Sequence, residues 1–146
     1  MFTKCIRAAN GPKDVGPYSP AIKLSDFVYL SGQLPIDPLT NELVPGGIGQ
    51  QTHQVMQNIL AILEEMGLET RHIVKTTVFL QNMGDFQAMN EVYASYFDEP
   101  YPARSCVQVA ALPKGAMVEI ECLVIDTLKY EQARNTNRKC EKCEGC

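Results

Sequence analysis

The chain has 146 residues, of which 45% are hydrophobic, 21% charged and 8% aromatic. This length suits one compact domain with its own core, and the composition excludes a collagen-like, low-complexity or wholly disordered chain. The formal net charge is −4, but 129–146 holds five basic and three acidic residues, so 1–128 keeps 8 basic and 14 acidic residues and a net charge of −6. An acidic body repels phosphate backbones, so nucleic-acid binding is disfavoured as the main function.

Nothing in the sequence indicates a membrane or a secretory route. No run approaches ~18 consecutive uncharged apolar residues, so we expect no membrane span. Residues 1–16 lack the apolar core of a signal peptide and the Arg/Ser-rich character of a transit peptide. The six cysteines do not have the spacing of a disulfide-stapled secreted domain, and reduced thiols fit better. We therefore expect a cytoplasmic protein.

The N-terminal third predicts an irregular segment followed by a hairpin. Residues 10–20 hold two Gly-Pro pairs and a third proline, which is incompatible with a helix. Strands over 21–24 and 27–31 flank the dipeptide Ser25-Asp26, which is typical of a tight turn. Prolines within 34–38 then end the second strand.

Two amphipathic helices follow. The first covers 52–66, where apolar residues repeat at helical spacing, and Gly67 ends it. Asp85 is the predicted N-cap of the second, whose apolar stripe runs from 86 to 97 and stops before Pro100.

Three further strands are predicted at 73–80, 104–110 and 117–125, from their β-branched and alternating residues. In the last of them every second residue from Val118 is apolar, whereas Glu119 shares the opposite face with other apolar side chains. A glutamate on such a face is typical of a subunit interface or a cleft.

The predicted strands and helices together indicate an α+β fold, with a single mixed β-sheet and two helices on one face. The other face carries enough apolar side chains to require a partner, so we expect an oligomer. The domain covers 1–128, and 129–146 is expected to be a polar, cysteine-containing and disordered tail.

Metal and cofactor motifs are weak or absent. His53 and His72 lack a metal-ligand spacing, and we expect both to be solvent-edge histidines. Cys140, Cys143 and Cys146 form C-x-x-C-x-x-C, one ligand short of a closed zinc or iron–sulfur site. Exposed thiols are expected there, with metal capture shared between subunits as the alternative. Dinucleotide, P-loop and serine-hydrolase motifs are missing, so no cofactor is predicted.

Five residues remain as candidates for chemistry. Arg104 opens a strand after a proline-bounded loop, and its guanidinium suits a carboxylate, although a surface ion pair is the alternative. Cys106 shares the face of Arg104, as a nucleophile or as a small apolar sheet residue. Glu119 is a general base holding a water, or a solvated strand glutamate. Tyr18 covers a pocket or simply packs, and Ser31 ends a strand.

Sequence geometry does not bring the two best candidates together. An antiparallel hairpin turning at Pro113-Lys114 would place Glu119 opposite Gln108, four residues or about 13 Å along the strand from Arg104. Either the strands pair differently or a second subunit completes the site.

Five blocks of the chain resemble the Rid family, and most closely its RidA branch. The blocks are GPYSPA (16–21), SGQLPIDPLT (31–40), QTHQVMQNIL (51–60), VKTTVFLQNMGDFQAMNEVY (74–93) and PARSCVQVAALPKGAMVEIE (102–121). The resemblance implies a chorismate-mutase-like fold and a homotrimer with intersubunit sites. It also implies a 2-iminobutanoate/2-iminopropanoate deaminase, which hydrolyses reactive 2-imino and enamine acids to 2-oxo acids and ammonia without a cofactor.

The same resemblance implies roles for individual residues. Arg104 would bind the substrate carboxylate, and Glu119 would position and activate the attacking water. The expected substrate contacts are Tyr18 and Ser31 lining the cleft, the backbone around Gly32 and Cys106, and Asn90 supporting the cleft wall.

Two other functions stay open. Some proteins that resemble this chain are described as ribonucleases or translation inhibitors, so an RNA-directed role is one alternative. A non-catalytic trimer that binds small acids or a protein is the other. The tail 129–146 has no counterpart in the family pattern.

Overall fold

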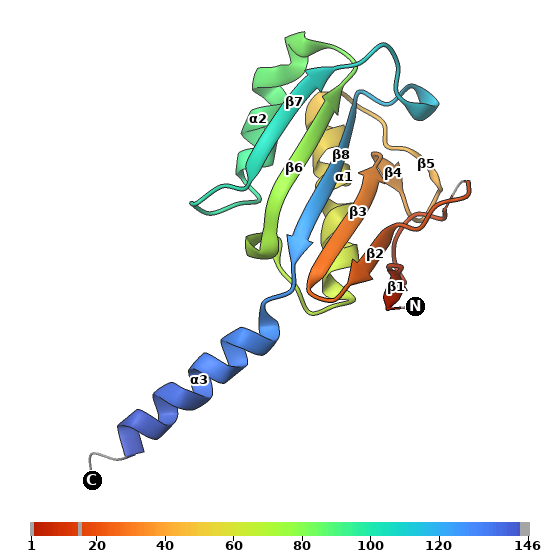
Figure 1. The fold of residues 1–146 in the computed structure, drawn as a ribbon. Coiled ribbons are helices and arrows are strands. Elements are labelled where there is room, and N and C mark those ends of the chain that lie inside the picture. The colour runs from red at the N-terminus through yellow and green to blue at the C-terminus, as the bar shows by residue number, and fades with distance from the viewer. Residues whose placement is uncertain (1, 15, 144–146) are drawn as a thin grey trace.

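The structure is a computed structural model that describes residues 2–14 and 16–143, with side chains as far as Asn135. Helices α1 and α2 cover one face of a sheet, and a third helix, α3, leads away from it (Figure 1). The strands are β1 (Thr3–Ile6), β2 (Ala21–Leu24), β3 (Phe27–Gln33), β4 (Ile36–Asp37), β5 (Glu42–Leu43), β6 (Ile73–Leu80), β7 (Ala103–Gln108) and β8 (Val118–Ile125). The helices are α1 (Ile48–Glu64), α2 (Phe86–Ala94) and α3 (Leu128–Cys143), with 3₁₀ turns η1 (Thr70–His72), η2 (Met83–Asp85) and η3 (Pro113–Gly115).

Six strands form one mixed sheet in the order β1-β2-β3-β8-β6-β7. Neighbouring strands are antiparallel, except for the parallel pair β6–β7. Strands β4 and β5 form a small ladder of their own. This arrangement confirms the predicted α+β class, with α1 and α2 on one face of the main sheet.

The core lies between the two helices and the sheet. Helix α1 contributes an apolar stripe that includes the fully buried Val55 and Ile59, and β8 contributes Ile120 and Val124, which are equally buried. A helix repeats every 3.6 residues and a strand every two, so each element presents one apolar face, and the two faces meet in a single layer.

The start of α1 differs from the sequence prediction, whereas the start of α2 confirms it. Helix α1 begins at Ile48, four residues before the predicted start at 52. The Gln50 side chain accepts a hydrogen bond from the Gly47 backbone N–H at 3.0 Å, so a backbone donor at the helix N-terminus has a partner although the sequence there is rich in glycine. Asp85 does occupy the N-cap of α2, but its side chain makes no capping hydrogen bond.

The strands predicted at 104–110 and 117–125 do not form a hairpin, so of the possibilities left open by the sequence the strands pair differently. Strand β6 lies between β7 and β8, with Phe79 in register with both Val107 and Glu119. Helix α2 connects β6 to β7, and a helical crossover brings two strands side by side in parallel rather than as a hairpin.

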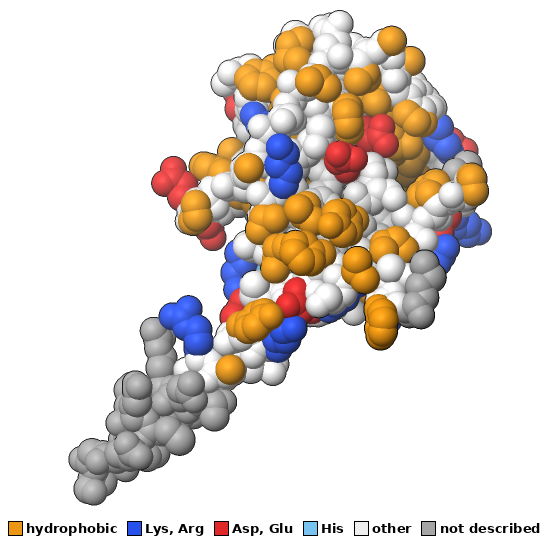
Figure 2. Space-filling model, viewed as in Figure 1, with side chains coloured by type: hydrophobic (Ala, Val, Ile, Leu, Met, Phe, Trp, Pro, Cys, Tyr) orange, Lys and Arg blue, Asp and Glu red, His pale blue; other side chains and the backbone are white. Residues whose placement is uncertain are grey.

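The sheet face opposite the helices is uncovered and largely apolar. Phe27 and Tyr29 are about half exposed, at 48% and 52%, and pair with Ile125 and Leu123 of β8. Figure 2 shows hydrophobic side chains gathered over this face, with acidic side chains beside them. The predicted apolar second face is therefore present in the single chain.

The segment after β8 is helical, whereas the sequence prediction was a disordered tail. Its first turns are held to the domain by Arg71, which donates to both carboxylate oxygens of Glu131 at 2.7 and 3.0 Å, and by an ion pair of Lys129 with Asp26 at 2.7 Å. The boundary between 1–128 and 129–146 stays a prediction. Of the helices described, none is long and apolar enough to cross a membrane.

Candidate active site

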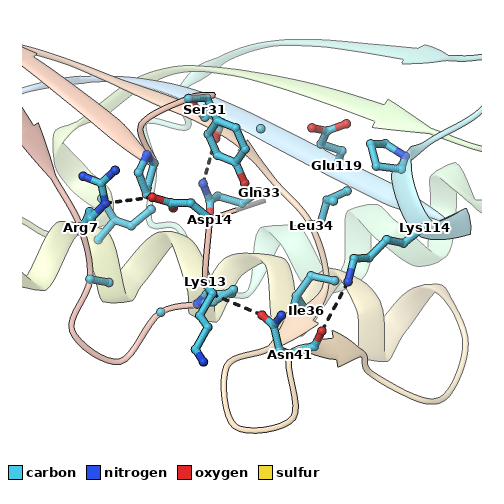
Figure 3. Close-up of a pocket in the computed structure, with 18 of the residues that line it drawn as sticks. Arg7, Lys13, Asp14, Ser31, Gln33, Leu34, Ile36, Asn41, Lys114 and Glu119 are labelled. Atoms are coloured by element: carbon cyan, nitrogen blue, oxygen red, sulfur yellow. Dashed lines mark hydrogen bonds and ion pairs between the residues drawn. The ribbon is translucent and has the colours of Figure 1, made fainter. Parts of the chain in front are cut away.

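A cavity of about 570 Å³ opens between the N-terminal segment, the end of β3 and the η3 turn (Figure 3). Residues from seven separate stretches of the chain line it: Arg7, Ala8, Ala9, Gly11, Pro12, Lys13, Asp14, Tyr18, Pro20, Ser31, Gly32, Gln33, Leu34, Ile36, Asn41, Ile62, Pro113, Lys114 and Glu119. Four sequence-predicted site residues, Tyr18, Ser31, Gly32 and Glu119, are among them.

Glu119 lies directly against the backbone at Gly32. A Cβ atom on Gly32 would come within 2.1 Å of Glu119 Oε1, so only glycine leaves room for this carboxylate. The register between β3 and β8 shifts between Leu30 and Gln33, which opens the ladder at this point. Burial raises the pKa of Glu119, and the charge of Glu121 raises it further. A carboxyl tuned in this direction exchanges protons closer to neutral pH than an exposed one.

Ser31 supports the segment that carries Tyr18. The Ser31 hydroxyl donates to the carbonyl of Ser19 at 2.6 Å, and the Ser31 N–H donates to the carbonyl of Pro20 at 2.9 Å. These bonds fix the proline-rich stretch at the mouth of the cavity, where Tyr18 is 47% exposed. The Ser31 hydroxyl is thus engaged by the protein itself in the structure.

Arg104 lies in a different pocket, on the other face of the sheet. Its Nη1 donates to Asn90 Oδ1 at 2.8 Å, and its guanidinium carbon lies 4.9 Å from the ring centre of Tyr93 and 5.6 Å from that of Phe86. Asn90, Tyr93, Ala94, Tyr101, Pro102 and Arg104 line this pocket of about 330 Å³. No carboxylate among the described side chains forms an ion pair with Arg104, so the surface-ion-pair interpretation finds no partner there.

Cys106 accompanies Arg104 on β7. Both residues are in register with buried residues of β6, Thr76 and Val78, and so face the helices. Burial raises the pKa of the Cys106 thiol, and the nearby Arg104 charge lowers it by less. The balance favours the neutral thiol, which fits a small sheet residue better than a nucleophile.

The single chain therefore separates the predicted site into two halves. Glu119 is in register with Phe79 on the open face, whereas Arg104 is in register with the buried Thr76 on the helix face. The two pockets share no lining residue. Arg104 on β7 and Glu119 on β8 are therefore not on neighbouring strands, because β6 lies between them.

Several residues that line the cavity were not predicted from the sequence. Lys114 and Asn41 reach it from turns in which both have left-handed backbone, with φ of 59° and 58°. The sequence showed turn chemistry at both places, but nothing in it indicated that turns 73 residues apart would meet. Arg7 and Asp14, paired at 2.8 Å, come from the N-terminal segment.

Metal ligands do not gather in the part of the chain with described side chains: no group of three or more His, Cys, Asp or Glu is placed to hold an ion. Cys140, Cys143 and Cys146 lie outside the described side chains. His53 is exposed as predicted, but His72 is buried, contrary to prediction. Its Nδ1 accepts a hydrogen bond from the Glu69 backbone N–H at 3.0 Å, because the η1 turn brings the imidazole ring back to the residue that precedes the turn.

Comparisons with known proteins agree on one family. A family model described as Endoribonuclease L-PSP matches residues 8–126. A RutC family protein of Pyrococcus horikoshii is 53% identical over 118 residues, 81% of this chain and 94% of that protein. A bovine protein named 2-iminobutanoate/2-iminopropanoate deaminase is 44% identical over 125 residues, 86% of this chain and 91% of that one. The crystal structure of RidA from an Antarctic Psychrobacter is 47% identical with a TM-score of 0.80, covering 84% of this chain and 98% of that one.

Proposed function

The chain belongs to the Rid family, and from this membership we propose that it hydrolyses 2-imino and enamine acids, such as 2-iminobutanoate and 2-iminopropanoate, to 2-oxo acids and ammonia. The observation that carries the proposal is the half-buried Glu119 carboxylate, held against Gly32 in a large cavity. The substrate is inferred from the family resemblance, and the raised pKa of the Glu119 carboxyl suits proton transfer.

The proposed assembly is a homotrimer in which the site forms between subunits. Arg104 and Glu119 face opposite sides of the sheet in one chain, so one substrate reaches both only if they come from different chains. The apolar open face supplies the surface for such an assembly. In this arrangement Arg104 of one subunit closes the cavity of its neighbour.

The proposed hydrolysis needs only a group that binds the carboxylate, a general base and a water molecule. Arg104, already held by Asn90 and two aromatic rings, binds the carboxylate of the substrate, a charge-assisted contact that contributes about 1.5–3 kcal/mol. Glu119 accepts a proton from a water molecule while the water oxygen bonds to the C=N carbon. That proton is passed to the imine nitrogen, which gives a carbinolamine. The hydroxyl proton of the carbinolamine then goes to the same nitrogen by way of the Glu119 carboxylate, the C–N bond breaks as the C=O bond forms, and ammonia leaves.

The RNA-directed alternative has less support. The net charge of −6 in 1–128 opposes approach to a phosphate backbone. The description of the matching family model as an endoribonuclease keeps this activity as an outcome to measure. A non-catalytic small-acid binder is the third possibility, and the same experiment separates it.

The test follows the decay of 2-iminobutanoate generated in place by an amino-acid oxidase. We expect faster decay with the wild-type protein, and no acceleration with Arg104→Ala or Glu119→Gln. Arg134→Ala is the matched control, because it removes an arginine from exposed helix α3. Unchanged decay with folded wild-type protein would overturn the proposal. RNA cleavage that survives in highly purified Arg104→Ala would instead support the ribonuclease alternative.

A further inference from the structure

The cavity is larger than the proposed small substrates require. A volume of about 570 Å³ lies in the range of pockets that enclose drug-sized ligands, whereas 2-iminobutanoate has a four-carbon chain. Only one end of the cavity, at Glu119 and Gly32, is used by the proposed hydrolysis. Apart from Tyr18 and Ser31, the other residues that line the cavity have no role in that function.

The end away from Glu119 is cationic. We call it the distal end and define it by Lys13, Asn41 and Lys114. Lys114 extends from the η3 turn toward Asn41, where its Nζ donates to the backbone carbonyl at 3.4 Å, and the Lys13 N–H donates to Asn41 Oδ1 at 3.3 Å (Figure 3). Neither ammonium forms an ion pair with any described carboxylate.

The remaining charges do not neutralise this end. Arg7 and Asp14 also line the cavity, but they pair with each other at 2.8 Å. The Lys114 ammonium, beside the Asn41 carbonyl, can therefore meet an anion that enters the cavity, and Lys13, whose side chain points away from Lys114 in Figure 3, adds positive charge nearby.

Between the two ends the lining is apolar. Figure 3 shows Leu34 and Ile36 between Glu119 on one side and Asn41 on the other. Ile62 from helix α1 also lines the cavity. Such an apolar lining suits methylene groups, because moving them from water to an apolar surface is favourable in free energy.

We propose that the distal end binds a second anionic group, so that the cavity selects 2-imino acids whose side chain is a short methylene spacer ending in a carboxylate. The inference rests on the proposed function: the C=N carbon lies at Glu119, the spacer crosses Leu34 and Ile36, and the terminal carboxylate meets Lys114, with the charge of Lys13 nearby. Lys114 and Lys13 are thus specificity-determining residues and take no part in bond making.

A matched pair of substrates tests this directly. 2-Iminoadipate and 2-iminohexanoate have the same number of carbons and differ in a terminal carboxylate or methyl group. We expect wild-type kcat/KM to favour 2-iminoadipate by about tenfold, the effect of one charge-assisted contact. Lys114→Met should remove most of this preference and Lys13→Met part of it, whereas Lys4→Met, an exposed lysine outside the cavity, should not change it. The preference should also weaken with added salt.

A binding measurement separates this inference from the proposed function. Calorimetry compares 2-oxoadipate, 2-oxohexanoate and inorganic phosphate, none of which needs turnover. Tighter binding of 2-oxoadipate that depends on Lys114 supports the distal site even if 2-iminobutanoate decay is not accelerated. Equal affinity for the two oxo acids, a preference that Lys114→Met leaves intact, or lysine-dependent binding of phosphate without any gain for 2-oxoadipate would overturn it.

Discussion

Gly32 is the residue at which strand β3 makes room for the Glu119 carboxylate. Its missing side chain matters because an added Cβ would lie 2.1 Å from Glu119 Oε1, well inside van der Waals contact. The obstructed atom is the end of a flexible side chain, so the backbone can stay in place while the carboxylate moves.

We therefore predict that Gly32→Ala loses most of its imine-hydrolysing activity but keeps its fold. Moving the carboxylate by an ångström is expected to cost about a hundredfold in kcat/KM, because a general base acts only at hydrogen-bond distance. The measurement pairs steady-state kinetics with thermal unfolding. Gly49→Ala, where a Cβ meets only Val92 Cγ2 at 3.9 Å, is the control. Full activity in Gly32→Ala would contradict the close approach.

Glu121 contributes to the electrostatic environment of Glu119. Burial is the larger cause of the raised pKa of Glu119, and the like charge of Glu121 is the next. A base works only when deprotonated, so activity should fall as the pH falls through this raised pKa, above the ordinary glutamate value of 4.5.

Glu121→Gln removes the like charge and keeps the shape of the side chain. The pKa of Glu119 should fall, so the acid limb of the kcat/KM profile should move to lower pH while the plateau changes little. A pH–rate profile of both proteins checks the direction. Glu91→Gln, on exposed α2, should leave the limb where it is. An upward shift, or none, would contradict the electrostatic coupling.

At the scale of elements, α3 is the part of the chain with the clearest electrostatic attachment. Arg71 forms both hydrogen bonds to Glu131, and Thr127 donates a third at 2.6 Å. These contacts lower the pKa of Glu131 to about 2, with Arg71 the largest cause. A carboxyl whose pKa is lower in the folded state stabilises that state above its unfolded pKa, and this contribution is lost as the pH falls.

We predict that the first turns of α3 lose protection as the pH falls from about 4.5 toward 2, and that Glu131→Gln loses it already at neutral pH. Amide hydrogen exchange over 128–135, compared with the sheet, measures this local opening. Glu64→Gln, on the exposed side of α1, is the control. Because the pair is exposed, only local exchange should respond, and a fall in global stability would contradict this account.

The strands and helices were largely predictable, but their neighbours were not. The span 73–80 matches β6, and the alternation from Val118 correctly identified the buried face of β8. Such patterns report the burial of one element at a time. The insertion of β6 between β7 and β8 depends on the crossover through α2, and the rule for β-α-β units would have favoured it over the hairpin.

At the scale of the molecule, the residues predicted for the site are divided between two places. Tyr18, Ser31, Gly32 and Glu119 share one cavity, and Arg104 lies in another pocket beside Asn90. Residue types and family motifs carry chemistry, whereas the face on which a side chain lies depends on register and pairing. Under the proposed function, a split of this kind together with an apolar open face requires the assembly to complete the site.

Co-assembly of two inactive variants tests that split. Arg104→Ala chains keep Glu119, and Glu119→Gln chains keep Arg104, so each variant alone has only defective sites. If a site takes Arg104 from one subunit and Glu119 from its neighbour, random co-assembly restores about one quarter of all sites, and about one third of the sites in trimers that contain both variants, since each intact site needs the right chain in both positions. Activity of co-expressed, doubly tagged oligomers against 2-iminobutanoate measures the recovery.

The alternative geometry makes a different prediction from the same mixture. A site built within one chain gives no intact copy in any mixed oligomer, because every chain lacks one of the two groups. Arg104→Ala chains co-expressed with the Arg104→Ala/Glu119→Gln double variant form the control, since no subunit then supplies the arginine. Recovery in the first mixture and not in the second would place the reacting groups across an interface. The open sheet face, which includes the exposed Phe27 and Tyr29, would then position the catalytic pair as well as bury apolar area.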